Sequence, residues 1–309
     1  MPRCSVVIVT WHCAALVTEC LHSLAQQQGV GDIELIVIDN ASADDTVTAV
    51  GQAWPGCVLV VNERNTGFAH ASNQGMALAR APLLCLLNPD TVLPRPDTLR
   101  RLIERVEQQP AIDAAGVRLV FPDGSHQVGD AGYLPTLAAA LAHAFLLTRP
   151  PLGLHGLFLQ DGQVPMPWGR VGWVSGACTL LRRSTLERAG GLDASYFLYG
   201  EDVDWGCRMN RLGLTVAYLP DIDIVHVQGG TQKPSAVAPP TRWIDGLSRL
   251  YNEYNRGRHF ATYRAAMATG FWLRALLCLA RDRDRARTMA AFARHFWRQR
   301  AGPLPAHPG

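Results

Sequence analysis

The stretch LLCLLNPDTVL (residues 83–93) decides the expected fold. It opens with four leucines and a cysteine, and a short apolar run of this kind is typical of an interior strand covered on both faces. Pro89 lacks a backbone donor and keeps the preceding residue extended, so the strand must end at Asn88. Asp90 then follows the carboxyl end of a strand, where ligands bind in open α/β sheets. Two interpretations remain open: a solvated Asn-Pro turn, or a carboxylate that holds a divalent cation against a phosphorylated substrate.

Similar apolar runs elsewhere in the chain predict a parallel sheet. The runs at residues 5–10, 34–38 and 58–61 are rich in valine and isoleucine, and each precedes a segment with helical or helix-capping character. Strands that alternate with helices form a mainly parallel sheet, and the loops along one edge of such a sheet form the site. The expected fold class is therefore α/β.

Polar and small residues follow these strands at the expected site edge. Asp39 is the first polar residue after the second strand, so it either caps the next helix or accepts hydrogen bonds from a nucleotide base or ribose. Gly67 lies where a loop becomes a helix, and it either lets a phosphate or ribose approach closely or simply caps that helix. The sequence has neither a GxGxxG motif nor a P-loop here, so the phosphate signal is weak.

A second distinctive stretch is FLYGEDVDW (residues 197–205). Glu201, Asp202 and Asp204 open a predicted helix, where the helix dipole favours carboxylates. The dipole does not account for the aromatic residues around them, which would desolvate a carboxylate and raise its basicity, as a general base requires. The stretch therefore predicts either a charge-stabilised helix start or a catalytic acid pair.

Two further apolar segments complete the expected sheet. Residues 171–181 predict one strand, in which Gly176 indicates that something approaches the backbone closely. Residues 216–219 and 222–227 predict two more strands. His226 lies in the last of them, where a lone histidine is either a buried core residue or a metal ligand.

The segments between these strands carry less information. PDGS at residues 122–125 predicts a tight hairpin turn. Residues 133–167 contain an apolar, helix-like piece and several prolines, and we expect an irregular insertion near the acceptor side. The sequence assigns no chemistry to this insertion.

Composition excludes several classes of protein. At 309 residues, with 48% hydrophobic and 18% charged residues, the chain can bury one large core or two smaller ones. Its eight cysteines form no CxxC pairs, which argues against a zinc site or a disulfide framework and favours reduced thiols in a cytoplasmic protein. The first residues show no basic segment and no cleavage site, so we expect no export signal.

The C-terminal part of the sequence differs from the rest in charge. From residue 242 onward it holds 13 arginines and four acidic residues, a balance of +9 in a chain of net charge +3, which leaves −6 for residues 1–241. Basic amphipathic helices either lie on an anionic bilayer or pack against the catalytic domain or a second subunit. No nucleic-acid-binding motif accompanies the charge, so we expect no nucleic-acid partner. The residues predicted to oppose the arginines on two long helices are Trp272, Leu273, Leu276, Leu277 and Leu279, and then Met289, Phe292, Phe296 and Trp297.

Five blocks of the sequence, in order, resemble the family-2 inverting glycosyltransferases of the GT-A fold, and in particular the bacterial rhamnosyltransferases that build O-antigen and cell-wall linker glycans. The resemblance covers residues 4–230, and the fixed order of the blocks makes it specific. It implies a GT-A catalytic domain at residues 1–235 and a basic helical region at residues 236–309. The blocks are DNASAD (39–44), NTGFAHASNQG (65–75), LLNPDTVL (86–93), SGAC (175–178) and FLYGEDVDWGCRMNRLG (197–213).

This resemblance implies roles for individual residues. Asp90 would hold Mg²⁺ or Mn²⁺ against the donor diphosphate, although Asn88 replaces the first carboxylate of the Asp-x-Asp pattern found in many members, and His226 would complete the metal site. Asp202 would be the catalytic base and Glu201 its supporting carboxylate; the opposite assignment of these two stays open. The residues implied to bind the nucleotide sugar are Thr10, Asp39, Asn65, Gly67, Asn73, Asn88, Trp173, Ser175 and Gly176.

The resemblance also implies a reaction and a location. The protein would transfer L-rhamnose from dTDP-rhamnose to a lipid-linked or polysaccharide acceptor, in the cytoplasm and peripherally at the inner face of the cytoplasmic membrane. Alternatives are another donor (UDP-GlcNAc, UDP-galactose or UDP-galactofuranose) or a non-catalytic GT-A scaffold. A nucleotidyltransferase would carry a glycine- and basic-rich loop after its first strand, where this sequence has Trp11-His12-Cys13. Sequence alone does not determine the oligomeric state.

Overall fold

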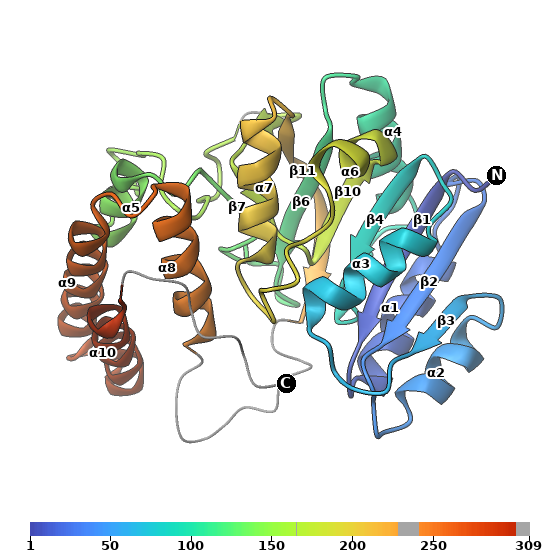
Figure 1. Cartoon of the computed structure of the whole chain (residues 1–309), viewed down its shortest axis with the longest axis horizontal. Coiled ribbons are helices and arrows are strands. Elements are labelled where there is room, and N and C mark those ends of the chain that lie inside the picture. The colour runs from blue at the N-terminus through green and yellow to red at the C-terminus, as the bar shows by residue number, and fades with distance from the viewer. Residues whose placement is uncertain (165, 228–240, 301–309) are drawn as a thin grey trace.

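The computed structural model describes residues 1–164, 166–227 and 241–300, and a nine-stranded sheet forms its centre (Figure 1). The spatial order of the strands is β3-β2-β1-β4-β10-β6-β11-β5, and β8 pairs with β11. A separate two-stranded sheet joins β7 (Ala131–Gly132) to β9 (Trp173–Val174). The strands of the main sheet are β1 (Cys4–Thr10), β2 (Ile33–Asp39), β3 (Val58–Val61), β4 (Leu83–Leu87), β5 (Thr91–Val92), β6 (Ala114–Val120), β8 (Gly169–Arg170), β10 (Cys178–Arg182) and β11 (Val216–His226).

Six of these strands run in the same direction. β1 pairs in parallel with β2 and β4, β2 with β3, and β6 with β11, whereas β10 lies antiparallel between β4 and β6. The carboxyl ends of β1, β2, β3, β4, β6 and β11 therefore share one edge of the sheet. The predicted α/β fold with a mainly parallel sheet is confirmed.

Helices cover both faces of the sheet. Side chains of α1, α2 and α4 pack in one apolar core, and side chains of α3, α6 and α7 pack in the other. All five residues of β4 are buried between these layers, as its unbroken apolar run predicts. The helices are α1 (Ala14–Ala25), α2 (Thr46–Ala53), α3 (Phe68–Leu78), α4 (Thr98–Gln108), α5 (Leu137–Ala144), α6 (Arg183–Ala189), α7 (Glu201–Arg211), α8 (Arg242–Tyr254), α9 (Phe260–Cys278) and α10 (Arg283–Arg298).

Two strand predictions are wrong in detail. Residues 171–181 do not form one strand, because the backbone N–H groups of Ser175 and Gly176 bond outside the sheet, to the Asp130 carbonyl and the Asp202 carboxylate. The segment is split into β9 and β10 by a turn at residues 175–177. Conversely, the two strands expected at 216–227 are the single strand β11, whose register against β6 shifts next to Pro220.

The C-terminal helices form a separate layer beside the sheet. In Figure 1, α8 lies between α7 and the pair formed by α9 and α10. Together with α5 these helices enclose their own apolar core, in which Tyr251 and Tyr263 stack with ring centroids 4.0 Å apart and Phe296 is fully buried. The predicted boundary between residues 235 and 236 lies outside the described residues. None of the helices described is both long and apolar enough to cross a membrane.

One of the two predicted apolar faces packs mainly against the protein, which is one of the two alternatives that the sequence left open. Phe296 is fully buried, and Met289 and Phe292 pack against the same core, so they face the protein and not solvent. Trp297 alone of that predicted group is exposed. By contrast, four apolar residues of α9 and the residue that follows it are exposed: Trp272, Leu273, Leu276, Leu277 and Leu279.

Candidate active site

Thr10 and Asp39 meet at the carboxyl ends of β1 and β2. Their register pairs them directly, and the Thr10 hydroxyl donates to Asp39 Oδ1 over 2.8 Å. Asp39 also accepts from the Ser42 hydroxyl (2.6 Å) and the Ser42 backbone N–H (2.8 Å), and it is fully buried. The N-cap of α2 is Asp45, so Asp39 does not cap that helix. Its carboxylate instead shapes the loop that follows β2.

Gly67 opens α3 in the left-handed region, with φ of 85°. Asn65 braces this turn, since its Oδ1 accepts from the Gly67 N–H over 2.9 Å. A Cβ at Gly67 would lie 2.7 Å from the Phe197 carbonyl oxygen, and the Phe68 N–H donates to that same oxygen over 3.0 Å. The close approach predicted at Gly67 is therefore filled by the protein's own backbone, and it joins α3 to the segment that precedes Glu201.

Two predicted donor-binding side chains are occupied by contacts within the protein. The Asn73 amide donates to the Leu192 carbonyl and accepts from the Leu192 N–H, both over 2.8 Å. The Trp173 ring is buried beneath α7, and its indole N–H donates to the Leu157 carbonyl over 3.3 Å. Both side chains therefore brace α7 and the loop before it.

Asp90 and His226 lie together at the carboxyl ends of β4 and β11. Asp90 Oδ1 is 3.3 Å from His226 Nε2, both residues are buried, and the Val227 N–H donates to the Asp90 carbonyl. On the other side of the imidazole, Nδ1 is 2.6 Å from Gln127 Oε1, and the Gln127 amide N–H₂ donates to the His226 carbonyl. An amide oxygen only accepts, so Nδ1 carries a proton and Nε2 is the ring nitrogen that faces Asp90.

This pair has the chemistry of a partial cation site. A carboxylate oxygen and an imidazole nitrogen face each other, and Asn88 Oδ1, in the same turn as Asp90, is buried with no hydrogen-bond partner among the described residues. The part of the chain that the structure describes contains no group of three or more His, Cys, Asp or Glu side chains able to hold a metal. The residues therefore fit a cation that takes its remaining ligands from a diphosphate and water, as Mg²⁺ commonly does.

Glu201 and Asp202 open α7 after a sharp turn. Gly200 is in the left-handed conformation with φ of 103°, and Glu201 is 4% exposed with no partner for Oε2 in the described structure. Burial, and then the neighbouring Asp202 charge, raise the pKa of Glu201 to about 8. Asp202 is half-buried, and its pKa is also raised by burial. Its oxygens accept from the backbone N–H groups of Val203 (2.8 Å) and Gly176 (3.3 Å).

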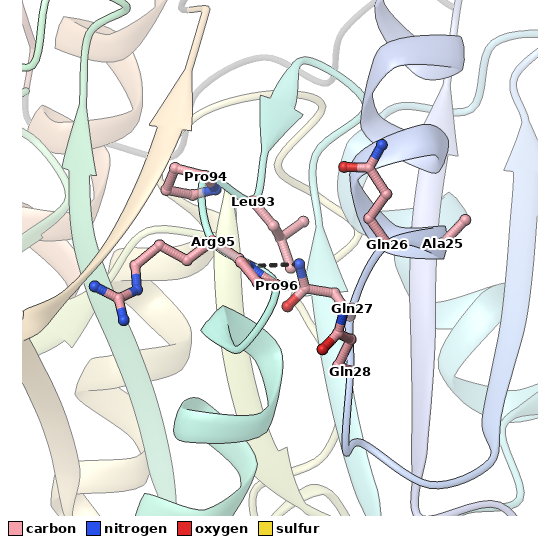
Figure 2. Close-up of a pocket in the computed structure, with 8 residues that line it drawn as sticks. All are labelled: Ala25, Gln26, Gln27, Gln28, Leu93, Pro94, Arg95 and Pro96. Carbon is pink, nitrogen blue, oxygen red and sulfur yellow. Dashed lines mark hydrogen bonds between the residues drawn. The ribbon is translucent and has the colours of Figure 1, made fainter.

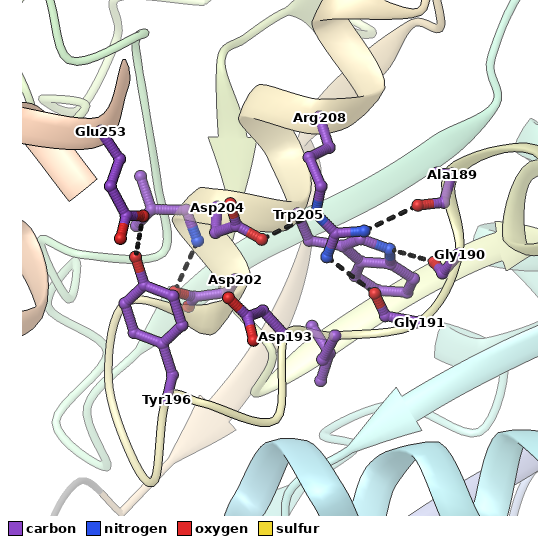
Figure 3. Close-up of polar contacts among 12 residues, drawn as sticks. Ala189, Gly190, Gly191, Asp193, Tyr196, Asp202, Asp204, Trp205, Arg208 and Glu253 are labelled. Atoms are coloured by element: carbon purple, nitrogen blue, oxygen red, sulfur yellow. Dashed lines mark hydrogen bonds and ion pairs between the residues drawn. The ribbon is translucent and has the colours of Figure 1, made fainter. Parts of the chain in front are cut away.

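The rest of the acidic turn is structural. Figure 3 shows Arg208 reaching Asp204 on its own helix and the carbonyls of Ala189 and Gly191, while the Trp205 indole N–H donates to the Gly190 carbonyl. These contacts bind α7 to the loop that follows α6. Asp204 is therefore an ion-pair partner that fixes the helix.

The two halves of the site meet at the 175–177 turn. The Asn88 N–H donates to the Ala177 carbonyl over 2.9 Å, two residues before Asp90. The backbone N–H of the preceding residue, Gly176, donates to the Asp202 carboxylate. Ser175 Oγ accepts from the Ala177 N–H and closes the turn. One three-residue turn thus connects the Asp90–His226 pair to the acid pair on α7.

A hollow elsewhere in the molecule does not share these features. It has a volume of about 480 Å³ and lies between the end of α1 and the segment after β5, where Gln27 Nε2 donates to the Arg95 carbonyl over 2.8 Å (Figure 2). Its lining contains no carboxylate and no histidine. None of the predicted site residues borders it.

Sequence reasoning missed two residues at the site edge. Gln127 lies at this edge because the hairpin turn at residues 122–125 reverses the chain, so that the Gln127 N–H donates to the Leu119 carbonyl. The available signal was a polar residue just beyond a predicted turn. Trp11 directly follows β1 and is 40% exposed, beside the loop that Asp39 holds. A large aromatic side chain at the carboxyl end of a buried strand was the available signal for Trp11.

Curated proteins with glycan-biosynthesis names are similar to this chain in sequence. The N-acetylglucosaminyl-diphospho-decaprenol L-rhamnosyltransferase of Mycobacterium tuberculosis is 30% identical over 205 residues, which are 63% of this chain and 66% of the relative. The O-antigen biosynthesis protein RfbC of Myxococcus xanthus is 25% identical over 251 residues, 79% of this chain. The chain spans only 19% of the length of RfbC and just under two thirds of the rhamnosyltransferase.

Solved structures share the fold. The mannosyltransferase PcManGT from Pyrobaculum calidifontis, in complex with GDP-Man and Mn²⁺, superposes with a TM-score of 0.56 at 19% identity, covering 96% of this chain and 85% of its own. TarS (residues 1–349) of S. aureus gives 0.51 at 16% identity, covering 96% and 92%. At these identities the likeness shows the fold alone.

The sequence also matches a known protein family over much of its length. The family described as glycosyl transferase family 2 matches residues 5–188, which extend from β1 into α6 and include both Asp39 and Asp90. That match covers more than half of the chain. The chain belongs to glycosyltransferase family 2.

Proposed function

We propose that this protein is an inverting, metal-dependent glycosyltransferase that moves L-rhamnose from dTDP-rhamnose to a lipid-linked or polysaccharide acceptor. The observation that carries the proposal is the convergence of the Asp90–His226 pair and Asp202 on the 175–177 turn. The names of the relatives, an L-rhamnosyltransferase and an O-antigen biosynthesis protein, support the sugar and the acceptor class.

The proposed chemistry is a single displacement. The acceptor hydroxyl attacks the anomeric carbon and gives its proton to the Asp202 carboxylate, while the bond from that carbon to the diphosphate oxygen breaks and the nucleoside diphosphate leaves. Attack opposite the leaving group inverts the configuration. A hydroxyl is a poor nucleophile near neutral pH, so a positioned base contributes about 10²–10⁴ in rate.

Asp202 is better suited than Glu201 to be the base. Asp202 is half-buried, and two backbone N–H groups fix its position without neutralising it. Glu201 is almost fully buried, and with a pKa of about 8 it is largely protonated at neutral pH. A neutral Glu201 adds no second negative charge beside Asp202, which is what a supporting carboxyl requires.

The pKa of Glu201 predicts how stability changes with pH. The folded chain holds this proton up to about pH 8, whereas the ordinary carboxyl value is 4.5, so the folded protein should lose stability as pH rises from 4.5 to 8. The loss is about 1.4 kcal/mol per pH unit in that window. Glu201→Gln should remove it, as measured by urea unfolding at pH 5 and pH 8. The exposed Glu187→Gln is the control; equal pH dependence in Glu201→Gln and wild type would contradict the assignment.

Asp90 and His226 are the proposed ligands of Mg²⁺ or Mn²⁺. A bound divalent cation would act as a Lewis acid on the leaving diphosphate. Asp90 supplies a charged oxygen and His226 a lone pair held by Gln127. The Mn²⁺ named with PcManGT supports a divalent ion in this fold.

Gln127 should control the affinity of that ion. Removing the amide in Gln127→Leu frees the imidazole to rotate, so Mn²⁺ binding should weaken about 10- to 100-fold. Mn²⁺ titration followed by electron paramagnetic resonance measures this directly. Gln160→Leu is the matched control, because the Gln160 amide donates to the Phe158 and Leu159 carbonyls in the insertion. Unchanged Mn²⁺ affinity in Gln127→Leu would contradict the role.

The proposed donor surface follows the sheet edge. Asp39 and Thr10 shape the loop beside Trp11, Asn65 and Gly67 shape the start of α3, and Asn88, Ser175 and Gly176 surround the 175–177 turn. We leave Asn73 and Trp173 out of this surface, because their polar atoms are bonded to backbone groups.

We propose that residues 1–235 form a catalytic domain and residues 236–309 a helical region. We place the protein in the cytoplasm, peripherally at the inner membrane.

Another nucleotide-sugar donor and a non-catalytic scaffold are the competing functions. Thermal-shift measurements with a nucleotide-sugar panel and Mn²⁺ separate them, because a ligand at 100 times its Kd adds about 2.7 kcal/mol of stability. The proposal expects the largest shift with dTDP-rhamnose and Mn²⁺-dependent hydrolysis of that donor. A larger shift with a UDP-sugar would overturn the donor, and binding without hydrolysis or transfer would favour the scaffold.

A further inference from the structure

The outer face of α9 is apolar although it faces solvent. The inner side of this helix already buries Tyr263, Met267 and Phe271 in the C-terminal core. On the solvent side, residues 272–279 include five large apolar side chains that are between 44% and 69% exposed. A contiguous exposed group of this size marks an interaction surface. These side chains, which we call the α9 patch, are Trp272, Leu273, Leu276, Leu277 and Leu279.

A groove between α9 and α10 adjoins the α9 patch. It has a volume of about 490 Å³, and its lining includes Trp272, Trp297, Arg294 and Arg298. Trp297 is 58% exposed, and the Arg294 guanidinium lies 6.0 Å from the centroid of the Trp272 ring. Tryptophan rings beside arginines are the combination that settles at the level of lipid headgroups, where one end of the side chain is apolar and the other is wet.

Positive charge surrounds the α9 patch. Residues 279–300 hold seven arginines and two aspartates, a balance of +5. Asp282 is used to cap α10 by accepting from the Arg285 N–H, and Asp284 pairs with Arg287. The loop after α5 adds Arg149; burial, and then the charge of Arg149, lower the pKa of Arg274. The exposed arginines of α10 and the turn before it are Arg281, Arg283, Arg285, Arg287, Arg294 and Arg298.

We propose that the α9 patch and its arginines dock the protein on the surface of an anionic phospholipid bilayer. Leucine and tryptophan side chains would enter the headgroup region while the arginines contact lipid phosphates. A second copy of the chain fits this surface poorly, because a symmetric dimer would place the same arginines against each other. Nucleic acid would match the charge but would leave the leucines unburied.

The α9 patch takes no part in the proposed sugar transfer. The inference rests on the proposed function only in assuming a lipid-linked acceptor. The acid turn lies beside the same helical layer, because Gly246 of α8 packs within van der Waals contact of the Tyr199 carbonyl and Gly200. A bilayer beneath α9 and α10 would thus keep the helical layer between the membrane and the acid pair.

Vesicle flotation of the full chain tests the proposal. The protein should float with vesicles of phosphatidylcholine containing 30% phosphatidylglycerol and bind pure phosphatidylcholine vesicles at least tenfold less. Leu276→Ser/Leu277→Ser should weaken binding more than tenfold, since each leucine loses most of its burial energy. Arg283→Gln/Arg285→Gln should weaken it about 25-fold, or fivefold per arginine, at low salt. All four substituted side chains are exposed, so folding should be preserved.

A matched control removes the same charge at the other end of α9. Arg256→Gln/Arg258→Gln, in the exposed turn between α8 and α9, should bind vesicles like wild type. Absence of vesicle binding, or equal binding by the patch variants and wild type, would overturn the proposal. So would a dimer in light scattering that Leu276→Ser/Leu277→Ser abolishes, because it would assign the α9 patch to a second copy. Donor thermal shifts measured without vesicles should be the same in all variants, so a failure of the membrane surface is distinguishable from a failure of the glycosyltransferase proposal.

Discussion

Asp202→Asn should reduce sugar transfer by about 10²–10⁴ while donor affinity stays within about twofold of wild type. The asparagine keeps the shape of the side chain, and its single oxygen keeps one of the two backbone hydrogen bonds, because the Val203 and Gly176 N–H groups bond to different Asp202 oxygens. It cannot accept the acceptor proton, so only the chemical step should suffer. Initial rates with a nucleotide-sugar donor, together with calorimetric donor titration, separate the two effects.

The control for this experiment lies one half-turn along the same helix. Asp204→Asn changes an equivalent carboxylate that pairs with Arg208, and it should retain transfer after correction for any loss of folded protein. Wild-type rates in Asp202→Asn would refute the assignment. If Glu201→Gln abolished transfer instead, the roles of the two acids would be exchanged.

Asp90→Ala should weaken donor binding in the presence of Mn²⁺ by at least tenfold. Asp90 is the charged half of the proposed cation site, and without it the ion keeps only the His226 nitrogen from this pair. Donor binding in EDTA should be the same for variant and wild type, because there is no ion to lose. Isothermal titration with and without Mn²⁺ gives both values.

Asp97→Ala provides the comparison for Asp90→Ala. Asp97 is a nearby acid that pairs with Arg95 near the surface, and its removal should leave metal-dependent donor binding unchanged. Equal Mn²⁺ enhancement of donor binding in Asp90→Ala and wild type would show that the cation, if present, is held elsewhere.

Local rules explain what the sequence predicts well. The position of Asp90 follows from two such rules, since an unbroken apolar run forms a buried strand and Pro89 ends its pairing. The hairpin at residues 122–125 and the helix start at Glu201 are likewise specified by residues within a few positions. Features of this kind require no knowledge of which segments meet in space.

Features that depend on distant partners were missed or misplaced. Asn73 faces Leu192, 119 residues away, and Gln127 faces His226, 99 residues away, so the neighbouring sequence identifies neither partner. The break in residues 171–181 arises because Asp130 and Asp202 bond to the backbone N–H groups there. Helical projection of the tail grouped Phe296 with Trp297, but only packing against α8 and α9 decides that Phe296 is the inner residue.

The most direct test of the account is a crystal structure of the protein with Mn²⁺ and a non-hydrolysable nucleotide-sugar analogue. The account predicts Mn²⁺ bound by Asp90 and the diphosphate, and the anomeric carbon positioned between that diphosphate and the Asp202 carboxylate. A diphosphate bound away from Asp90, or an anomeric carbon whose face opposite the diphosphate is closed to Asp202, would contradict it.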